Sequence, residues 1–142
     1  MRVALVTGGG SGIGRSAALE LNKIDFTVYV VGRREEELIK TSSLATNNNH
    51  KIIPIKTDIT IGSQVIALFD KIKSDHGRID LLFNNAGMGA PRVPIEDLKE
   101  EDWRKTVDVN LTGSFLCSQQ AIKLMKNQSP QGGRIVNNGS VS

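Results

Sequence analysis

Cysteine, histidine and aromatic residues are scarce in this sequence of 142 residues. The single cysteine, Cys117, excludes a disulfide within the chain and a zinc site built from several cysteines. Two histidines, His50 and His76, leave little for a histidine-based metal site, so we expect no bound metal. Aromatic residues make up only 4%, too few for a platform on which nucleic-acid bases stack.

Long hydrophobic runs are also missing. No run approaches the roughly 18 apolar residues of a membrane-spanning helix, so we expect no membrane partner. Near the start, only Val3 to Val6 precede a polar, glycine-rich stretch, whereas a secretory leader needs about 7–15 apolar residues. A cytoplasmic protein is therefore expected. The net charge is +3, of which Arg33 and Arg34 supply two charges, so no nucleic-acid partner is expected.

Short apolar runs alternate with amphipathic stretches along the chain. The runs predict five strands, at 3–6, 26–31, 51–56, 79–83 and 134–137. The stretches predict helices at 13–21, 35–44, 61–72 and about 96–126, the last with room for a break near 102–105. Pro54 cannot donate to a β-ladder, which places its strand at a sheet edge. Cys117, Trp103 and Met125 are expected to pack inside the protein.

This alternation predicts the fold class. Strands separated by helices pair in parallel through right-handed crossovers. We therefore expect an α/β fold, a Rossmann-type doubly wound parallel sheet with strand order 3-2-1-4-5, truncated after its fifth strand. Ligands of such sheets bind at the carboxyl ends of the strands where the order reverses, here between the first and fourth strands.

The loop after the first strand is rich in glycine, and it reads Thr7-Gly8-Gly9-Gly10-Ser11-Gly12-Ile13-Gly14. Glycines permit a tight turn, let a pyrophosphate approach the backbone and let the next helix pack closely on the sheet. The start of that helix adds free N–H groups and partial positive charge. The Lys-Ser/Thr of a Walker loop is absent. A dinucleotide site is the favoured interpretation, and a structural glycine-rich turn is the alternative.

Four motifs, in this order, resemble those of the short-chain dehydrogenases/reductases across nearly the whole chain. They are Thr7-Gly8-x-x-x-Gly12-x-Gly14, Asn84-Asn85-Ala86-Gly87, Asn110 within Val109-Asn110-Leu111-Thr112-Gly113, and the segment from Gly133 to Ser140. The resemblance implies cofactor contacts from Gly8, Gly12, Ile13, Gly14, Asp58, Ile59, Asn85, Ala86 and Gly87. Asp58 would contact the adenine, although it could instead cap the following helix, a role for which Thr60 competes. Asn84 is expected to tie the fourth strand to its neighbour.

The resemblance also implies two catalytic residues. Asn110 would support a proton relay and a helix kink, and Ser140 would polarise the carbonyl of a small-molecule substrate. The family's Tyr-x-x-x-Lys motif should follow this serine, yet the sole tyrosine is Tyr29, inside the second strand. The chain thus resembles the N-terminal part of a longer reductase, a single NAD(P)-binding domain over residues 1–142. Alone it is expected to be inactive, and the full-length protein is expected to form a homo-oligomer.

The second strand ends in Gly32-Arg33-Arg34, with Gly32 at the family's acidic position. A carboxylate there would bind a ribose 2′-hydroxyl, whereas an arginine nearby accepts a 2′-phosphate. The two arginines also open a helix, where positive charge is unfavourable, which suggests a compensating ligand. NADP(H) is therefore favoured over NAD(H), with Arg33 as the main contact, helped by Arg34 and Ser11. A solvated basic pair is the alternative.

Together these features predict an NADP(H)-dependent oxidoreductase that transfers hydride between nicotinamide and a carbonyl or secondary alcohol. The alternative is a non-enzymatic NADP(H)-binding or redox-sensing module. An α/β methyltransferase is disfavoured, because its cofactor has no phosphate for Arg33 and Arg34 to bind.

Overall fold

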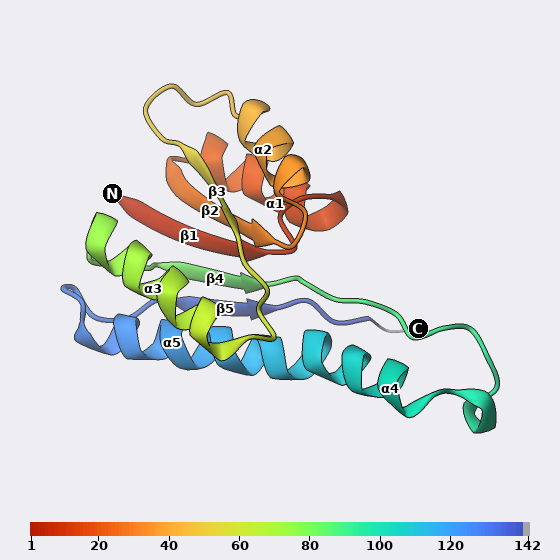
Figure 1. The fold of residues 1–142 in the computed structure, drawn as a ribbon. Coiled ribbons are helices and arrows are strands. Elements are labelled where there is room, and N and C mark those ends of the chain that lie inside the picture. The colour runs from red at the N-terminus through yellow and green to blue at the C-terminus, as the bar shows by residue number, and fades with distance from the viewer. Residues whose placement is uncertain (141–142) are drawn as a thin grey trace.

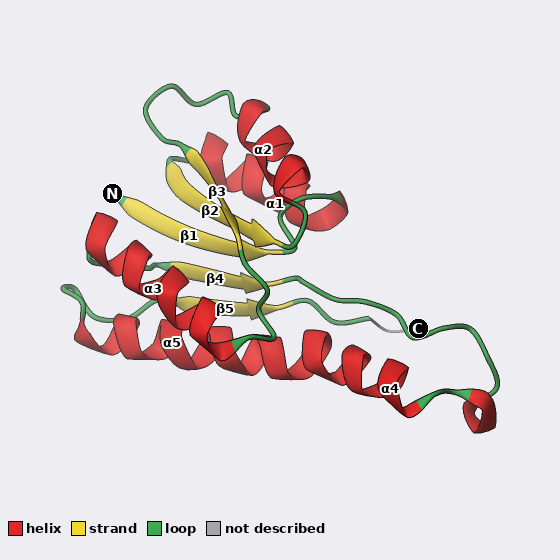
Figure 2. Ribbon diagram, viewed as in Figure 1, coloured by secondary structure: helices red, strands yellow, loops and turns green. Residues whose placement is uncertain are grey.

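Five parallel strands form one sheet between two layers of helices in the computed structural model, which describes residues 1–140 (Figures 1 and 2). The elements are β1 (Arg2–Thr7), α1 (Gly12–Lys23), β2 (Phe26–Gly32), α2 (Glu35–Ser43), β3 (Ile52–Lys56), α3 (Gly62–His76), β4 (Leu81–Asn84), a 3₁₀ turn (Ile95–Asp97), α4 (Glu100–Val107), a π-helical turn (Asp108–Thr112), α5 (Gly113–Asn127) and β5 (Arg134–Asn137). The sheet order is β3-β2-β1-β4-β5, which confirms the predicted fold class and strand order.

The helices cover both faces of the sheet (Figure 1). Because side chains alternate along a strand, Val3 and Leu5 of β1 pack toward α3 and α5, whereas Ala4 and Val6 pack toward α1 and α2. All four are completely buried. Burial on both faces explains why the strand reads as an uninterrupted apolar run.

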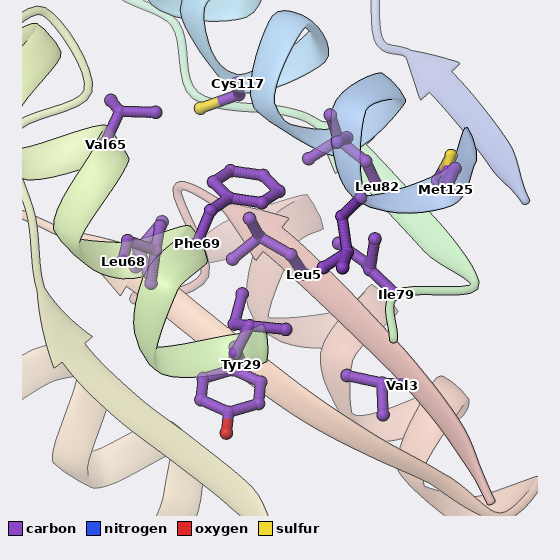
Figure 3. Packing of buried hydrophobic residues seen from close by; sticks show 14 of the residues in the cluster. Val3, Leu5, Tyr29, Val65, Leu68, Phe69, Ile79, Leu82, Cys117 and Met125 are labelled. Carbon is purple, nitrogen blue, oxygen red and sulfur yellow. The ribbon is translucent and has the colours of Figure 1, made fainter. Parts of the chain in front are cut away.

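The larger of the two cores lies between the sheet and helices α3 and α5 (Figure 3). Phe69 of α3 and both Cys117 and Met125 of α5 belong to it, which confirms the packing predicted for the last two. Burial raises the pKa of the Cys117 thiol to about 12, so the thiol stays protonated at neutral pH. The prediction for Trp103 is wrong, because this side chain is 59% exposed on α4, a helix with no buried residue.

The ends of the sheet are β3 and β5. Pro54 pairs with Val30 in the end strand β3, as its missing N–H predicts. At the other end, Val136 of β5 is 45% exposed. Among the described residues, β5 therefore presents an unpaired edge.

The long predicted helix differs from expectation in two ways. Regular helix begins at Glu100, after the short turn at Ile95–Asp97. The expected break near 102–105 is wrong, because the irregularity is the π-helical turn at Asp108–Thr112. This turn contains Asn110, whose side chain is bonded to the loop after β4 rather than to its own helix.

Asp80 ties the start of β4 to β1. Its Oδ2 accepts a hydrogen bond from the Val3 N–H at 2.8 Å, and both carboxylate oxygens accept from Arg78. Burial raises the pKa of Asp80, but the hydrogen bonds from Arg78 and Val3 outweigh it and leave the pKa below its usual value. The ionised carboxylate is therefore the form that stabilises the fold.

We expect Asp80→Asn to lower the free energy of unfolding by about 2 kcal/mol at pH 7, because bonds to a charged acceptor are lost. Since folding depresses this pKa, the stabilisation exists above the unfolded value of about 3.9 and disappears as pH falls through the folded value. Urea unfolding at pH 7 and pH 3 should therefore show a gap from wild type that is smaller at pH 3. Asp70→Asn, on the exposed face of α3, is the matched control. A gap of equal size at both pH values would contradict this role.

Candidate nucleotide and active site

The glycine-rich loop joins β1 to α1 at the carboxyl edge of the sheet (Figure 1). Gly8 and Gly12 have φ of 65° and 51°, in the left-handed region that favours glycine. Gly14 is required for packing: a Cβ there would lie 2.1 Å from the Gly8 carbonyl oxygen and 2.6 Å from Asn85 Nδ2. Its missing side chain lets α1 approach both β1 and the loop after β4.

A hollow of about 390 Å³, called hollow A, opens beside this loop. Of the predicted cofactor residues it brings together Gly8, Ser11, Arg33, Arg34, Asp58, Ile59, Ala86 and Gly87. Its remaining wall is Gly10, Val31, Gly32, Glu37, Leu38, Thr57, Thr60 and Val109. The loops after β1, β2, β3 and β4, helix α2 and the π-helical turn therefore meet at the carboxyl ends of these strands.

A wider hollow of about 1050 Å³, called hollow B, adjoins the first. Ala86 and Gly87 line both, so the two hollows adjoin at the β4 loop. The predicted catalytic residues Asn110 and Ser140 both line hollow B, together with Ile13 and Asn85. The predicted contacts Gly12 and Gly14 line neither hollow and shape the loop instead.

Asn110 is held in place by the loop after β4. Its Oδ1 accepts from the Met88 N–H at 3.0 Å, and its Nδ2 donates to the Met88 carbonyl at 2.7 Å. Gly87 leaves room for this contact, because a Cβ there would lie 2.9 Å from Asn110 Oδ1. The π-helical turn and the β4 loop are thereby fixed to each other at the floor of hollow B.

Asparagine side chains align the carboxyl ends of β4 and β5. Asn84 Nδ2 donates to Asn137 Oδ1 at 2.9 Å and to Ser118 Oγ at 3.0 Å, which confirms the predicted tie between neighbouring strands. Asn138 Nδ2 donates to Asn85 Oδ1 at 2.9 Å. These bonds position the segment that carries Ser140 beside the β4 loop.

Asp58 lies in a local turn at the wall of hollow A. Its Oδ1 accepts from both the N–H and the hydroxyl of Thr60, at 3.0 and 2.6 Å. Helix α3 begins at Gly62 after the flanking residue Ile61, and no side chain caps it. The alternative in which Asp58 or Thr60 caps this helix is therefore wrong.

Three residues to which the sequence analysis assigned no role, Thr7, Arg15 and Glu37, also build the site. The buried Thr7 hydroxyl accepts the N–H groups of Asn85 and Ala86 at 3.0 and 2.9 Å, which joins the β1 and β4 loops. Arg15 of α1 and Glu37 of α2 form an ion pair. Each contact links segments far apart in sequence. The only local signals are a polar residue ending an apolar strand and an arginine directly after Gly14.

The sole tyrosine lies away from both hollows. The Tyr29 hydroxyl donates to Asp75 Oδ2 at 2.7 Å, and its ring packs against His76 with centroids 5.7 Å apart. Burial, and then the bond to Asp75, raise the pKa of Tyr29 above its usual value. The Tyr29 hydroxyl therefore helps to pack α3 against the sheet. It is not placed to protonate a ligand in hollow B.

The described part of the chain contains neither a metal-binding cluster nor a membrane-spanning helix. Within residues 1–140, no three His, Cys, Asp or Glu side chains gather closely enough to hold a metal ion. Over the same residues, none of the helices combines the length and apolar character needed to cross a bilayer.

The sheet order, the glycine-rich loop and the hollows at the carboxyl edge define a Rossmann-type nucleotide-binding fold. The family model described as short chain dehydrogenase matches residues 2–142. The chain belongs to the short-chain dehydrogenase family.

Relatives in this family are similar along nearly the whole chain. A 3beta-hydroxysteroid dehydrogenase of Mediterraneibacter gnavus is 37% identical over 99% of this chain and 50% of its own length. A metagenomic short-chain oxidoreductase in complex with NADP superimposes with a TM-score of 0.92 at 27% identity, over 99% of this chain and 63% of its own. An NAD⁺-bound xylitol dehydrogenase superimposes with a TM-score of 0.91 at 31% identity, over 98% of this chain and 53% of its own. The chain spans about half the length of the curated relatives it matches.

Proposed function

We propose that this chain forms the cofactor half of an NADP(H)-dependent oxidoreductase that transfers hydride between nicotinamide and a carbonyl or secondary alcohol. The observation that carries the proposal is hollow A, where the glycine-rich loop meets Arg33, Arg34 and Asp58. A bound nicotinamide dinucleotide supplies the hydride, and the protein orients it. The pyrophosphate would lie against the N–H groups at the start of α1.

Arg33 and Arg34 are the basis for preferring NADP(H). Both are exposed, both line hollow A, and in the described part of the chain neither forms a salt bridge. They precede α2, whose N-terminus disfavours cations, so a phosphate would relieve an electrostatic cost. Planar guanidinium groups suit a phosphate bound through two hydrogen bonds, and Ser11 adds a hydroxyl donor.

Hollow B would hold the nicotinamide and the substrate. Ser140 would donate to the substrate oxygen, and Asn110, fixed to Met88, would support a proton relay. Tyr29 faces the core, so we expect the proton donor and its lysine to come from residues other than these 142, and this chain alone to show no turnover. We also propose that the complete protein is a homo-oligomer, since Leu111, Phe115 and Ile122 expose apolar surface along one helix.

We expect Arg33→Met to weaken NADPH binding about 10-fold while changing NADH binding less than about 3-fold, because only NADPH carries the 2′-phosphate. Calorimetric titration of both cofactors measures this. Arg92→Met is the matched control, since Arg92 is exposed on a loop and lines neither hollow. Equal affinity of the wild type for NADPH and NADH would contradict the preference. No binding of either would reject the cofactor site itself.

A non-enzymatic NADP(H)-binding or redox-sensing module is the second candidate. It is favoured by the burial of the sole tyrosine in a bond to Asp75. This candidate predicts saturable NADPH binding by the native gene product and no oxidation of NADPH with any ketone. Ketone-dependent oxidation of NADPH by the protein isolated from its source would reject it.

A further inference from the structure

Arg15 and Glu37 form a charge pair at the junction of the glycine-rich loop and α2. Arg15 Nη2 lies 2.8 Å from Glu37 Oε2, and the two side chains are 19% and 32% exposed. The same guanidinium donates to the Gly10 carbonyl, and its Nε donates to Thr41 Oγ at 2.9 Å. Thr41 Oγ donates in turn to the Gly9 carbonyl at 2.8 Å. Arg15 is therefore held in one orientation, facing the carboxylate.

Glu37 is part of the wall of hollow A, which Arg33, Arg34 and Ser11 also line. Its backbone also lies close to the loop, since a Cβ on Gly10 would approach Glu37 Cβ to 3.2 Å. The hydrogen bond from Arg15 lowers the pKa of the Glu37 carboxyl, against the opposing effect of burial, and Lys40 and Arg34 lower it further. The wall of the hollow thus carries a carboxylate that is ionised at neutral pH.

A carboxylate in this position opposes the binding of a second anion. A 2′-phosphate held by Arg33 and Arg34 would carry close to two negative charges in the hollow that Glu37 also lines. Arg15 supplies the compensating positive charge through its 2.8 Å contact with that carboxylate, and it does not itself line the hollow. A cofactor without the 2′-phosphate would be largely indifferent to this charge.

We propose that the Arg15–Glu37 pair sets the cofactor preference: Arg15 is a positioning residue that neutralises Glu37 and so admits a 2′-phosphate into hollow A. This inference rests on the proposed NADP(H) function and adds to it a residue pair that determines the cofactor preference. Removal of Arg15 exposes the carboxylate charge to the phosphate. Removal of the Glu37 charge leaves Arg15 as an additional cation near the phosphate, so the two changes act in opposite directions.

The test compares two nucleotides that differ in the 2′-phosphate, adenosine 2′,5′-bisphosphate and adenosine 5′-monophosphate, by calorimetric titration of the 142-residue chain. The measured quantity is the ratio of their affinities. Arg15→Met should lower this ratio about 10-fold, and Glu37→Gln should raise it about 3-fold. The double variant Arg15→Met/Glu37→Gln should return it to near the wild-type value. Glu36→Gln removes the same charge from an exposed position outside the hollow and should leave the ratio unchanged.

The outcomes separate this inference from the function on which it rests. A wild-type ratio of one overturns the NADP(H) preference. A wild-type preference that survives Arg15→Met, or that Arg15→Met removes without rescue by Glu37→Gln, overturns the role of the pair alone. Parallel loss of both nucleotides would assign Arg15 to loop tethering only. If circular dichroism shows that Arg15→Met does not fold, the test rests on Glu37→Gln. An affinity ratio for Glu37→Gln equal to that for Glu36→Gln then overturns the inference.

Discussion

Adding one methyl group at Gly14 is expected to abolish nucleotide binding. In Gly14→Ala, the new Cβ would lie 2.1 Å from the Gly8 carbonyl oxygen, 2.8 Å from its carbonyl carbon and 2.6 Å from Asn85 Nδ2. Two of these atoms belong to backbone in the turn itself, so α1 must move away from β1. We expect a loss of about 3 kcal/mol in the free energy of unfolding. We also expect NADPH affinity to fall more than about 100-fold, because the loop no longer presents its N–H groups together.

Thermal unfolding and NADPH titration measure the two effects. Gly62→Ala is the control, since Gly62 begins α3 and a Cβ there would meet nothing within 4 Å. That change should be neutral or stabilising by about 0.5 kcal/mol, because alanine restricts the unfolded chain. NADPH binding by Gly14→Ala at wild-type affinity would show that the loop can shift without cost.

The fold was predictable because its signals are local. The buried runs that became β1 and β2 are apolar on both faces, and the glycines that end them mark the turns. Pro54 placed its strand at the edge through one missing donor. The π-helical turn at Asp108–Thr112 lies where the family resemblance implied a helix kink, at Asn110. Helical periodicity alone misplaced the break at 102–105, because the Asn110–Met88 bond at this turn joins residues far apart in sequence. The packing prediction for Trp103 was wrong because the apolar character of a side chain does not show whether another element covers that side chain.

In the candidate site, too, residues with a local signal were predictable and residues with distant partners were not. Residues that lie within a continuous motif, such as Ser11 and Arg33, were found from the sequence and line one hollow in the structure. The roles assigned to them and to Asn110 and Ser140 stay predictions. No role was assigned to Thr7, although it stands in the glycine-rich motif, or to Arg15 and Glu37, because each acts through a partner on another element. None of these three residues has a local spacing that reveals its contact with another element.

Thr7→Val is expected to be strongly destabilising although it nearly preserves shape. The Thr7 side chain is 1% exposed, and its hydroxyl accepts two backbone N–H groups, those of Asn85 and Ala86. Valine fills the same space and leaves both donors without this acceptor in a part-buried loop. Since each unsatisfied donor costs about 1–3 kcal/mol, we expect the free energy of unfolding to fall by about 3 kcal/mol.

The same change should weaken NADPH binding about 10-fold, because Ala86 lines both hollows and loses its tie to β1. Thr7→Ser keeps the hydroxyl and removes only a methyl group, so it should retain the binding and lose about 1 kcal/mol of stability. Urea unfolding and NADPH titration of the pair separate hydrogen bonding from packing. If Thr7→Val matched Thr7→Ser in both measurements, the hydroxyl would not be what joins the β1 and β4 loops, and the position of Ala86 would have to be set by β4 and the asparagine contacts with β5.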